Sequence, residues 1–431
     1  MNLHALTAEK PVSRLDQASA SADHPACRFC GAALSRSVVD LGMSPLCESF
    51  LTSHELDRME PFYPLNVRIC DQCLLVQLPE YVAPEAIFTE YAYFSSFSDS
   101  FVRNAADYVA HIAQRLGLDE NSSVVELASN DGYLLQHFVE RKIPVLGVEP
   151  AQNVAAAAVE RGVPTRVAFF GEETADELVR EGYTADLVIA NNVLSQAPHL
   201  NDFVAGMKHL LAPEGTATVE FPHLMQLIEA NLFDTIYHEH FTYFSLSTAE
   251  KVFAAHGLAV VDLDEIANHG GSLRLYLEHA ERGHSPSAAV ESFREREAQA
   301  GLGSFETYGA FRDRIEATKR AVLDFLISAK RDGKTVAGYG APGKANTLLN
   351  YCGIRADLLD YTVDRNPYKH GRFTPGTHIP IFPPERLAET RPDYIWILPW
   401  NLKDEIAEQL SYARDWGARF FVAVPELAVL Q

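Results

Sequence analysis

The chain has 431 residues, of which 47% are hydrophobic and 22% are charged, and its formal net charge is −22 at pH 7. This is the composition of a globular protein, and a chain of this length is expected to form about two to four domains, because one core rarely grows past about 250–300 residues. The negative charge repels polyanions and argues against a nucleic-acid partner.

No apolar run approaches the roughly 20 residues that a membrane helix needs, and residues 1–24 lack the apolar centre of a signal peptide. We expect a cytoplasmic monomer or homodimer without membrane contact, with residues 1–24 as a disordered tail. Six cysteines are too few for a disulfide scaffold, and paired cysteines in a reducing compartment indicate a metal site. Cys47 and Cys352 are unpaired and are expected to pack as small apolar residues.

Residues 25–97 are rich in turns and short strands and contain two Cys-x-x-Cys pairs, Cys27 with Cys30 and Cys70 with Cys73. Four thiolates are the ligand set of a closed tetrahedral zinc site. The alternative is two unrelated pairs of buried cysteines. This is improbable in a chain with so few cysteines. The pairs therefore predict a zinc-binding domain in which the metal supports folding rather than chemistry.

Residues 98–265 alternate helical segments with apolar ones, and residues 266–431 repeat this pattern after a charged helical stretch, Pro286–Arg331. Such alternation predicts parallel sheets covered by helices on both faces. We therefore expect an α/β chain with two doubly wound domains after the zinc-binding domain. The expected strands lie in Val124–Ser129, Val145–Pro150, Ala185–Asn191, Thr216–Phe221, Thr335–Gly340, Leu358–Asp364, Tyr394–Trp400 and Arg419–Pro425.

The first of these strands leads into a turn, Ala128–Gly132, and Glu149 ends the next strand. A carboxylate there is placed for two ribose hydroxyls. The full glycine fingerprint for a pyrophosphate is absent, which favours S-adenosylmethionine over NAD; the alternative is an ordinary strand end with a capping Asp. Phe169 and Phe170 are candidates for contact with adenine, and the alternative is that they belong to the core. The predicted cofactor residues are Glu126, Ala128, Asn130, Asp131, Gly132, Glu149, Phe169, Phe170, Asn191 and Asn192.

Four polar side chains follow one another in Tyr237-His-Glu-His240. Carbon methylation needs a carbanion or enolate, and a histidine is an efficient base for removing a proton next to a ketone. A tyrosine can stabilise the enolate oxygen. One alternative is that His238 and Glu239 face solvent while His240 caps a helix. Another is a metal pair formed by His238 and His240.

Gly338, Gly340 and Gly343 form a Gly-x-Gly-x-x-Gly loop after an apolar strand, and Lys344 follows. Taken alone, the loop fits a dinucleotide-binding unit and an NAD-dependent oxidoreductase. Its helix N-terminus is also suited to the pyrophosphate of a nucleotide-sugar, to which Lys344 would add positive charge.

Five motifs occur in order: the double Cys-x-x-Cys, Asn130-Asp-Gly-Tyr-Leu-Leu-Gln136, Tyr237-His-Glu-His240, His269-Gly-Gly-Ser-Leu-Arg274 and Gly338-Tyr-Gly-Ala341. From about Cys27 onward, the chain therefore resembles the three-domain sugar C-methyltransferases of deoxysugar biosynthesis. The resemblance implies a zinc-binding domain, a class I methyltransferase domain and a Rossmann-like domain. It further implies methylation of a carbon beside the ketone of a nucleotide-diphosphate 4-keto-deoxysugar, with dTDP as the usual carrier.

The resemblance implies His240 as the base, supported by Glu239 and Tyr237. It also implies a catalytic tyrosine from the segment 91–96, for which Tyr91 is favoured and Tyr93 is the alternative; a tyrosine-rich edge strand would explain the segment as well. The resemblance places the nucleotide-sugar between the second and third domains. Gln196, where a histidine is expected, and Pro342-Gly343 depart from the family pattern and leave the exact sugar open. The third alternative is a zinc-bearing interaction module with degenerate enzyme domains. The candidate substrate residues are Tyr93, Ser95, Ser96, His269, Gly340, Lys344, Asn346, Asp364, Trp400 and Asn401.

Overall fold

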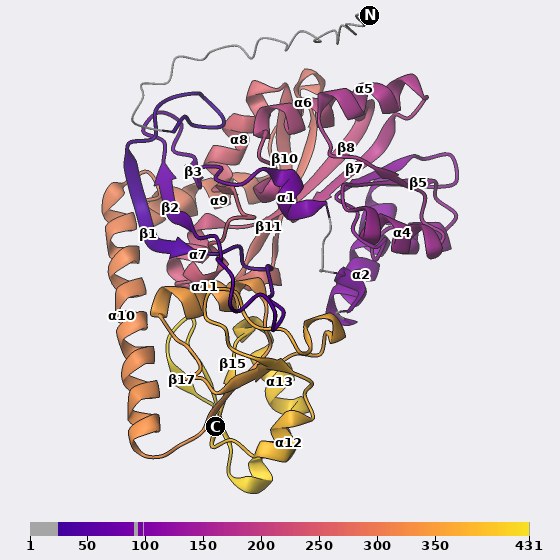
Figure 1. Ribbon diagram of the computed structural model, residues 1–431. Coiled ribbons are helices and arrows are strands. Elements are labelled where there is room, and N and C mark those ends of the chain that lie inside the picture. Colours follow the sequence, from indigo (N-terminus) through magenta and orange to yellow (C-terminus); the bar gives the residue numbers. More distant parts are fainter. Residues whose placement is uncertain (1–24, 90–93, 98, 431) are drawn as a thin grey trace, which may run out of the picture.

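The computed structural model describes residues 25–89, 94–97 and 99–430, so the expected tail, residues 1–24, lies outside them. Within this part of the chain there are three sheets, of four, seven and six strands; Figure 1 shows the first at the left, the second at the upper right and the third at the bottom. None of the helices in these residues has the length and apolar character needed to span a membrane. The expected α/β fold class, with a small first domain and two doubly wound domains, is confirmed.

The four-stranded sheet has the order β1-β2-β3-β9, and its fourth strand comes from far along the chain. Val76 of β3 pairs with Tyr243 of β9, so the segment that carries His240 runs directly into the first domain's sheet. In β2 buried positions alternate with partly exposed ones, as expected when one face of a sheet is covered. The elements here are β1 (Arg36–Ser44), β2 (Tyr63–Ile69), β3 (Val76–Gln77), α1 (Pro84–Phe88), η1 (Ser95–Phe97) and β9 (Thr242–Tyr243).

The seven-stranded sheet has the order β10-β11-β8-β7-β4-β5-β6. Its strands β8, β7, β4, β5 and β6 are parallel, and all four residues of β4 are buried, because helices cover both faces. The strands are β4 (Val124–Leu127), β5 (Val145–Glu149), β6 (Thr165–Val167), β7 (Ala185–Asn191), β8 (Leu211–Pro222), β10 (Leu258–Ile266) and β11 (Ser272–His279). The helices are α2 (Asp99–Leu116), α3 (Gln136–Glu140), α4 (Gln152–Glu160), α5 (Glu172–Arg180), η2 (Leu194–Gln196), α6 (Leu200–Leu210), α7 (Leu224–Glu229), η3 (Phe233–Thr235), α8 (Leu246–Ala255), η4 (Asn268–Gly270) and η5 (Ala280–Arg282).

The boundary expected at residue 265 falls inside this sheet. Strand β11 lies antiparallel between β8 and β10, so the central sheet extends to His279. The sequence did not indicate this, because an antiparallel hairpin added to a parallel sheet interrupts the alternation of strands and helices.

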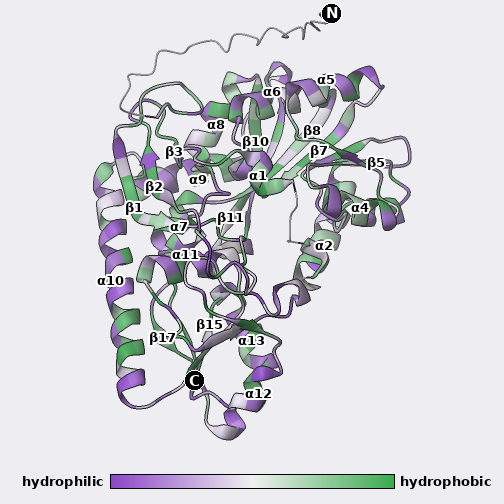
Figure 2. Ribbon diagram, in the orientation of Figure 1, coloured by the Kyte–Doolittle hydropathy of each residue, from purple (hydrophilic) through white to green (hydrophobic). Residues whose placement is uncertain are grey.

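Two helices, α9 (Ala288–Ala300) and α10 (Phe305–Arg331), connect the central sheet to the third. Buried residues recur every three or four positions along α10, and Figure 2 shows this helix alternating between hydrophobic and hydrophilic colours. The six-stranded sheet has the order β14-β13-β12-β15-β16-β17. Its elements are β12 (Val336–Tyr339), α11 (Gly343–Cys352), β13 (Tyr361–Val363), η6 (Pro367–Lys369), β14 (Ile381–Phe382), α12 (Arg386–Thr390), β15 (Tyr394–Ile397), η7 (Trp400–Leu402), α13 (Lys403–Gln409), η8 (Ser411–Trp416), β16 (Arg419–Val422) and β17 (Ala428–Val429).

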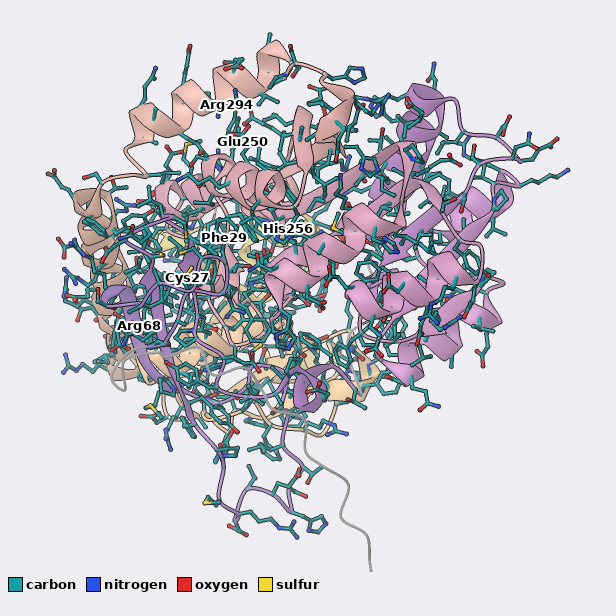
Figure 3. All side chains as sticks on the ribbon, turned by 90° about the horizontal axis from the view of Figure 1, so that it is seen from above. Cys27, Phe29, Arg68, Glu250, His256 and Arg294 are labelled. Carbon is teal, nitrogen blue, oxygen red and sulfur yellow. The ribbon has the colours of Figure 1, made fainter. Side chains whose placement is uncertain are left out.

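The first domain is attached to both of the others. Asn201 of α6 donates to the carbonyl of Phe29 at 2.9 Å and bonds His256 at 3.0 Å, and Figure 3 shows Cys27 and Phe29 close to His256. An excursion from the first domain, residues 45–61, which we call the arm, reaches the third domain. Within it, Leu51 forms a two-way backbone bridge with Phe373.

Candidate functional site

The four paired cysteines lie together. Their sulfurs are all within 4.8 Å of one another, with Cys27 3.6 Å from Cys73 and Cys30 3.5 Å from Cys70. Zn–S bonds of about 2.3 Å give tetrahedral S–S edges of about 3.8 Å, so the cluster fits zinc. The Gln77 amide donates to the Cys27 sulfur at 3.1 Å, which is the kind of outer contact that orients a metal ligand. This cluster is the structural zinc site.

The turn after β4 has the backbone that a close ligand approach requires. Ala128 and Asn130 have φ values of 55° and 51°, and a Cβ on Gly132 would lie 3.0 Å from Val163 Cγ2. Glu149 accepts the backbone N–H groups of Asn130 at 3.0 Å and Ala151 at 2.9 Å. Each carboxylate oxygen keeps a second lone pair, so these bonds orient Glu149 while leaving it able to accept ribose hydroxyls.

Three acidic side chains are buried together at this turn: Glu126, Asp131 and Glu149. Burial raises the pKa of Glu126 well above its usual range, and the charges of Glu149 and Asp131 raise it further. Arg161 pairs with Asp131 at 2.7 Å. Among the described residues, Glu126 Oε2 and Asp131 Oδ1 accept no hydrogen bond. Acidic oxygens with unfilled acceptor positions suit a ligand that carries hydrogen-bond donors, such as the ammonium and ribose hydroxyl groups of S-adenosylmethionine, better than a pyrophosphate, which only accepts.

The other predicted cofactor residues differ in their surroundings. Phe170 packs edge-to-face on Phe203 with ring centroids 5.4 Å apart and so belongs to the core, whereas Phe169 is 40% exposed and can meet a ligand. Asn191 and Asn192 stand at the carboxyl end of β7. Their amide oxygens are buried without a hydrogen-bond partner in the described part of the chain, as expected for groups that face a ligand site.

The segment Tyr237–His240 lies between η3 and β9. His240 Nδ1 is 2.9 Å from the carbonyl oxygen of Thr235. A carbonyl only accepts, so Nδ1 carries the proton and the neutral ring presents Nε2 as its basic nitrogen. The rings of His240 and Tyr237 lie 4.1 Å apart, tilted by 33°. Burial raises the pKa of Tyr237 well above its usual range, and its hydroxyl therefore remains a donor at neutral pH.

His238 and Glu239, which lie between Tyr237 and His240, point toward the first domain. His238 is buried, bonds the carbonyl of Pro64 at 3.2 Å and meets Tyr63 edge-on. Burial lowers its pKa, so it stays neutral and structural. Glu239 is buried and accepts from the thiol of Cys47 at 3.4 Å. His238 and His240 bond to different backbone carbonyls, those of Pro64 and Thr235, which does not favour a metal pair.

The loop of the third domain is occupied by carboxylates from the chain itself. Asp364 accepts the backbone N–H of Ala341 at 2.7 Å, and the carboxylate of Glu48, in the arm, lies beside Gly343, the first residue of α11. A Cβ on Gly343 would lie 3.1 Å from Glu48 Oε1. Two carboxylates of the chain, Asp364 and Glu48, therefore lie at this loop.

Three other predicted substrate residues, Lys344, Asn346 and Gly340, make separate contacts in the third domain. Lys344 Nζ contacts Asn401 Oδ1 at 2.5 Å and lies 4.6 Å from the centre of the Trp400 ring. Asn346 donates to the carbonyl of Cys47 and so holds the arm. Gly340 has φ of 87° and lies against Pro399.

Ser95 and Ser96 contact the cofactor turn. The Ser95 N–H donates to Asn130 and the Ser96 hydroxyl donates to Asp131. Tyr91 and Tyr93 lie outside the described residues, as does the side chain of His269 in η4.

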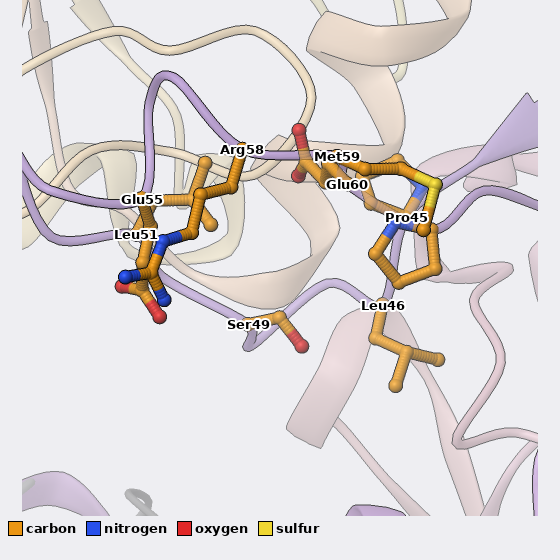
Figure 4. Close-up of a pocket in the computed structure, with 9 residues that line it drawn as sticks. Pro45, Leu46, Ser49, Leu51, Glu55, Arg58, Met59 and Glu60 are labelled. Atoms are coloured by element: carbon orange, nitrogen blue, oxygen red, sulfur yellow. The ribbon is translucent and has the colours of Figure 1, made fainter.

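A hollow of about 190 Å³ opens in the arm and is lined by its own residues (Figure 4). Figure 4 shows Met59 and Glu60 on one side and Leu46 and Ser49 on the other. None of the predicted site residues lines it, so it is separate from the catalytic segment and from the cofactor turn.

Comparisons with known proteins agree with this organisation. Three family models match in order: a zinc binding domain over residues 27–88, a methyltransferase domain over 101–263 and a C-methyltransferase C-terminal domain over 267–425. The chain is 36% identical over 404 residues to the C-methyltransferase NovU of Streptomyces niveus, covering 94% of this chain and 96% of that protein. The chain belongs to this family of C-methyltransferases. It is an S-adenosylmethionine-dependent enzyme, and the oxidoreductase and interaction-module alternatives are set aside.

Solved structures resemble this C-methyltransferase only in part. The PH0226 protein of Pyrococcus horikoshii OT3 is 15% identical with a TM-score of 0.37, covering 45% of this chain and 97% of that one. An S-adenosylmethionine-dependent methyltransferase of Clostridium acetobutylicum is 11% identical with a TM-score of 0.34, covering 41% and 92%.

Three residues that contact predicted site residues were not indicated by the sequence. Cys47 contacts Glu239, Glu48 lies beside the loop of the third domain, and Asp234 accepts the indole N–H of Trp400 at 2.7 Å. Asp234 lies three residues before Tyr237, and this closeness in the sequence was the one feature that could have pointed to it. Cys47 and Glu48 had no such feature, because their partners lie in other domains.

Proposed function

We propose that this enzyme methylates the carbon beside the ketone of a nucleotide-diphosphate 4-keto-deoxysugar, with dTDP as the expected carrier. The observation that carries the proposal is the hydrogen bond from His240 Nδ1 to the Thr235 carbonyl, which leaves Nε2 as the basic atom. A methyltransferase that modifies carbon needs such a base, since an unactivated C–H bond is not nucleophilic.

In the proposed reaction, His240 Nε2 removes the proton on the carbon next to the ketone, and the C–H electrons move into an enolate. The Tyr237 hydroxyl donates to the developing oxyanion, which is the transition-state contact that accelerates such steps most. Bound S-adenosylmethionine supplies the methyl group. Burial and the charge of Glu239 both raise the pKa of Tyr237 and so help to keep that hydroxyl protonated.

The substrate class is tested by incubating the enzyme and S-adenosylmethionine with a panel of dTDP- and UDP-linked keto-sugars and their reduced alcohols. We expect a mass gain of one methylene on a keto-sugar and none on its alcohol, because only the ketone acidifies the adjacent C–H. Methylation of an alcohol, or of a hydroxyl oxygen in the keto-sugar, would contradict the proposal.

The role of Glu149 is tested with Glu149→Gln, which keeps the shape of the side chain but removes its charge. We expect S-adenosylhomocysteine to bind about 10- to 100-fold more weakly by calorimetry, because a charge-assisted bond to a ribose hydroxyl contributes about 1.5–3 kcal/mol. Exposed Glu160, at the end of α4, supplies the control Glu160→Gln, which should bind like the wild type. Equal binding by both variants would remove Glu149 from the cofactor site.

A further inference from the structure

We propose that Glu220 is a positioning residue for S-adenosylmethionine, which fixes the side-chain amide of Asn192 so that the amide oxygen faces the ammonium group of the cofactor. Arg274 holds Glu220 in the orientation that this requires. The inference goes beyond the proposed function, because it concerns the cofactor and holds for any methyl acceptor. Neither Glu220 nor Arg274 belongs to the cofactor residues that the sequence predicts.

Glu220 lies near the carboxyl end of β8, in the middle of the central sheet. In the strand ladders it is opposite Asn191 of β7 on one side and Arg274 of β11 on the other. The strand order β8-β7-β4-β5-β6 reverses direction between β7 and β4, and open parallel sheets bind ligands outside the carboxyl ends of the strands at such a point. Glu220 is therefore one strand away from the place where the cofactor is expected.

Both carboxylate oxygens of Glu220 accept hydrogen bonds from other side chains. The side chain is 2% exposed, and its Oε2 accepts from Arg274 Nη2 at 2.6 Å. Its Oε1 is shared by the amides of Asn192 and Asn268, whose Nδ2 atoms each lie at 3.4 Å. An ionised carboxylate only accepts, so each of these amides must turn its NH2 group toward Glu220.

The backbone keeps Asn192 beside Glu220. The Asn192 N–H donates to the Glu220 carbonyl at 2.7 Å, and the φ of Asn192 is 56°, a left-handed conformation that asparagine tolerates better than most residues. Because the NH2 group faces Glu220, the amide oxygen Oδ1 faces away from it. That oxygen is buried and has no partner among the described residues, which indicates a place for a donor from a ligand.

The position of Asn192 identifies this donor as the ammonium group. Glu149, at the end of β5, is placed for the ribose hydroxyls, and β5 and β7 lie on opposite sides of β4. A cofactor that extends from Glu149 across the turn after β4 therefore brings its methionine part to Asn192. In that part only the ammonium group donates hydrogen bonds, since the carboxylate accepts and the sulfonium has no N–H or O–H bond.

Arg274 decides the direction of the hydrogen bonds in this network. It is 9% exposed, and its guanidinium carbon lies 4.3 Å from the centre of the Tyr108 ring. Burial lowers the pKa of Arg274, but the charge of Glu220 is the largest of the effects that outweigh burial and raise this pKa above its ordinary value. A guanidinium only donates, so the side chain at position 220 must turn an oxygen toward it.

The first test is Glu220→Gln in the whole enzyme. The new amide should turn its oxygen to Arg274 and its NH2 group to Asn192 and Asn268, so that Asn192 has to reverse and present its own NH2 group to the ammonium. We expect S-adenosylhomocysteine to bind about 10- to 100-fold more weakly by calorimetry, because a charge-assisted hydrogen bond is lost. The analogue 5′-methylthioadenosine, which lacks the amino-acid part, should bind as in the wild type.

The double variant Glu220→Gln/Arg274→Met separates positioning from a merely structural role. Methionine packs against Tyr108 in place of the arginine stem but needs no acceptor, so the new amide can turn its oxygen back to Asn192. We expect the double variant to recover most of the S-adenosylhomocysteine affinity that Glu220→Gln loses, although it keeps fewer native contacts. A merely structural pair predicts the opposite order of affinities.

Glu265→Gln is the matched control. It removes the carboxylate of another glutamate–arginine pair on the same sheet, the exposed pair of Glu265 in β10 with Arg296, and should bind both probes normally.

Asn192→Gly tests the contact itself without changing the Glu220–Arg274 pair. Glycine tolerates a φ of 56°, so the fold should persist while the amide oxygen is lost. S-adenosylhomocysteine should again bind more weakly and 5′-methylthioadenosine normally. Wild-type affinity for S-adenosylhomocysteine in this variant would show that Asn192 does not contact the ammonium, and Glu220 would then have nothing to position.

Two further results would overturn the proposal. One is wild-type binding of S-adenosylhomocysteine by Glu220→Gln, and the other is a double variant that binds it no better than Glu220→Gln does. Neither result bears on the keto-sugar, which the panel of substrates tests separately.

Discussion

Replacing His240 with glutamine is expected to lower kcat by about 10²- to 10⁴-fold, the usual contribution of a general base. The physical reason is that Nε2 is the basic atom of the ring, since Nδ1 donates to the Thr235 carbonyl. Steady-state kinetics with the keto-sugar nucleotide identified by the substrate panel measures the effect, and calorimetry with S-adenosylhomocysteine should show unchanged cofactor binding.

A direct measurement of proton removal shows whether His240 is the base or takes no part in this step. In D₂O, with S-adenosylhomocysteine bound so that no methyl group is available, the wild type should exchange the proton beside the ketone. His240→Gln should not. His238→Gln is the matched control, because that ring contacts the Pro64 carbonyl and not the site, and it should exchange normally even if less stable. Exchange at the wild-type rate in His240→Gln would eliminate His240 as the base.

Removing the zinc is expected to unfold the first domain and abolish activity. Four thiolates in one cluster bind zinc with an apparent free energy of about 10–16 kcal/mol, which exceeds the stability of a small sheet. Activity should be lost as well, because β3 pairs with β9 directly after His240 and the arm supplies Cys47 to Glu239.

The zinc-free enzyme can be prepared in two ways, with the variant Cys70→Ser or with a strong chelator. Metal analysis should find one zinc per chain in the wild type and less in the variant. Hydrogen exchange should show loss of protection in residues 25–89. Cys352→Ser changes a cysteine that is also buried but lies outside the cluster, and it should retain the zinc. A Cys70→Ser protein without zinc that melts and turns over like the wild type would refute a structural metal.

Local patterns were enough to predict much of the cofactor and metal sites. The strand, turn and acidic strand end around Asn130 and Glu149 depend on residues close together in the chain, and their periodicity reports burial directly. The same holds for the zinc cysteines, whose spacing encodes two tight turns. The sequence could not show which ring nitrogen of His240 carries the proton, because this depends on the hydrogen bond to the Thr235 carbonyl. The contacts of His238 and Glu239 depend on a neighbouring domain.

The third-domain loop shows why the rest required the structure. Its glycines are the same whether a pyrophosphate or a protein carboxylate lies on the helix N-terminus, because both are anions that accept from the same N–H groups. The sequence separation between Glu48 and Gly343 gives no local signal of their contact. The sequence also did not indicate that β11 joins the central sheet, since its antiparallel pairing comes after the alternating pattern has ended.

By itself, the sequence determined the class of each domain, the pairing of four cysteines that fits zinc, and the turn and strand end where we expect the cofactor. These features follow from hydrophobic periodicity and short motifs, which act over one turn or one strand. Only the tertiary structure decided which charges meet across domains: Glu48 beside the third-domain helix, Asp234 near Lys344 and Cys47 against Glu239. Such pairings are set by how the three sheets pack, and electrostatic interactions depend on distance in space rather than separation along the chain.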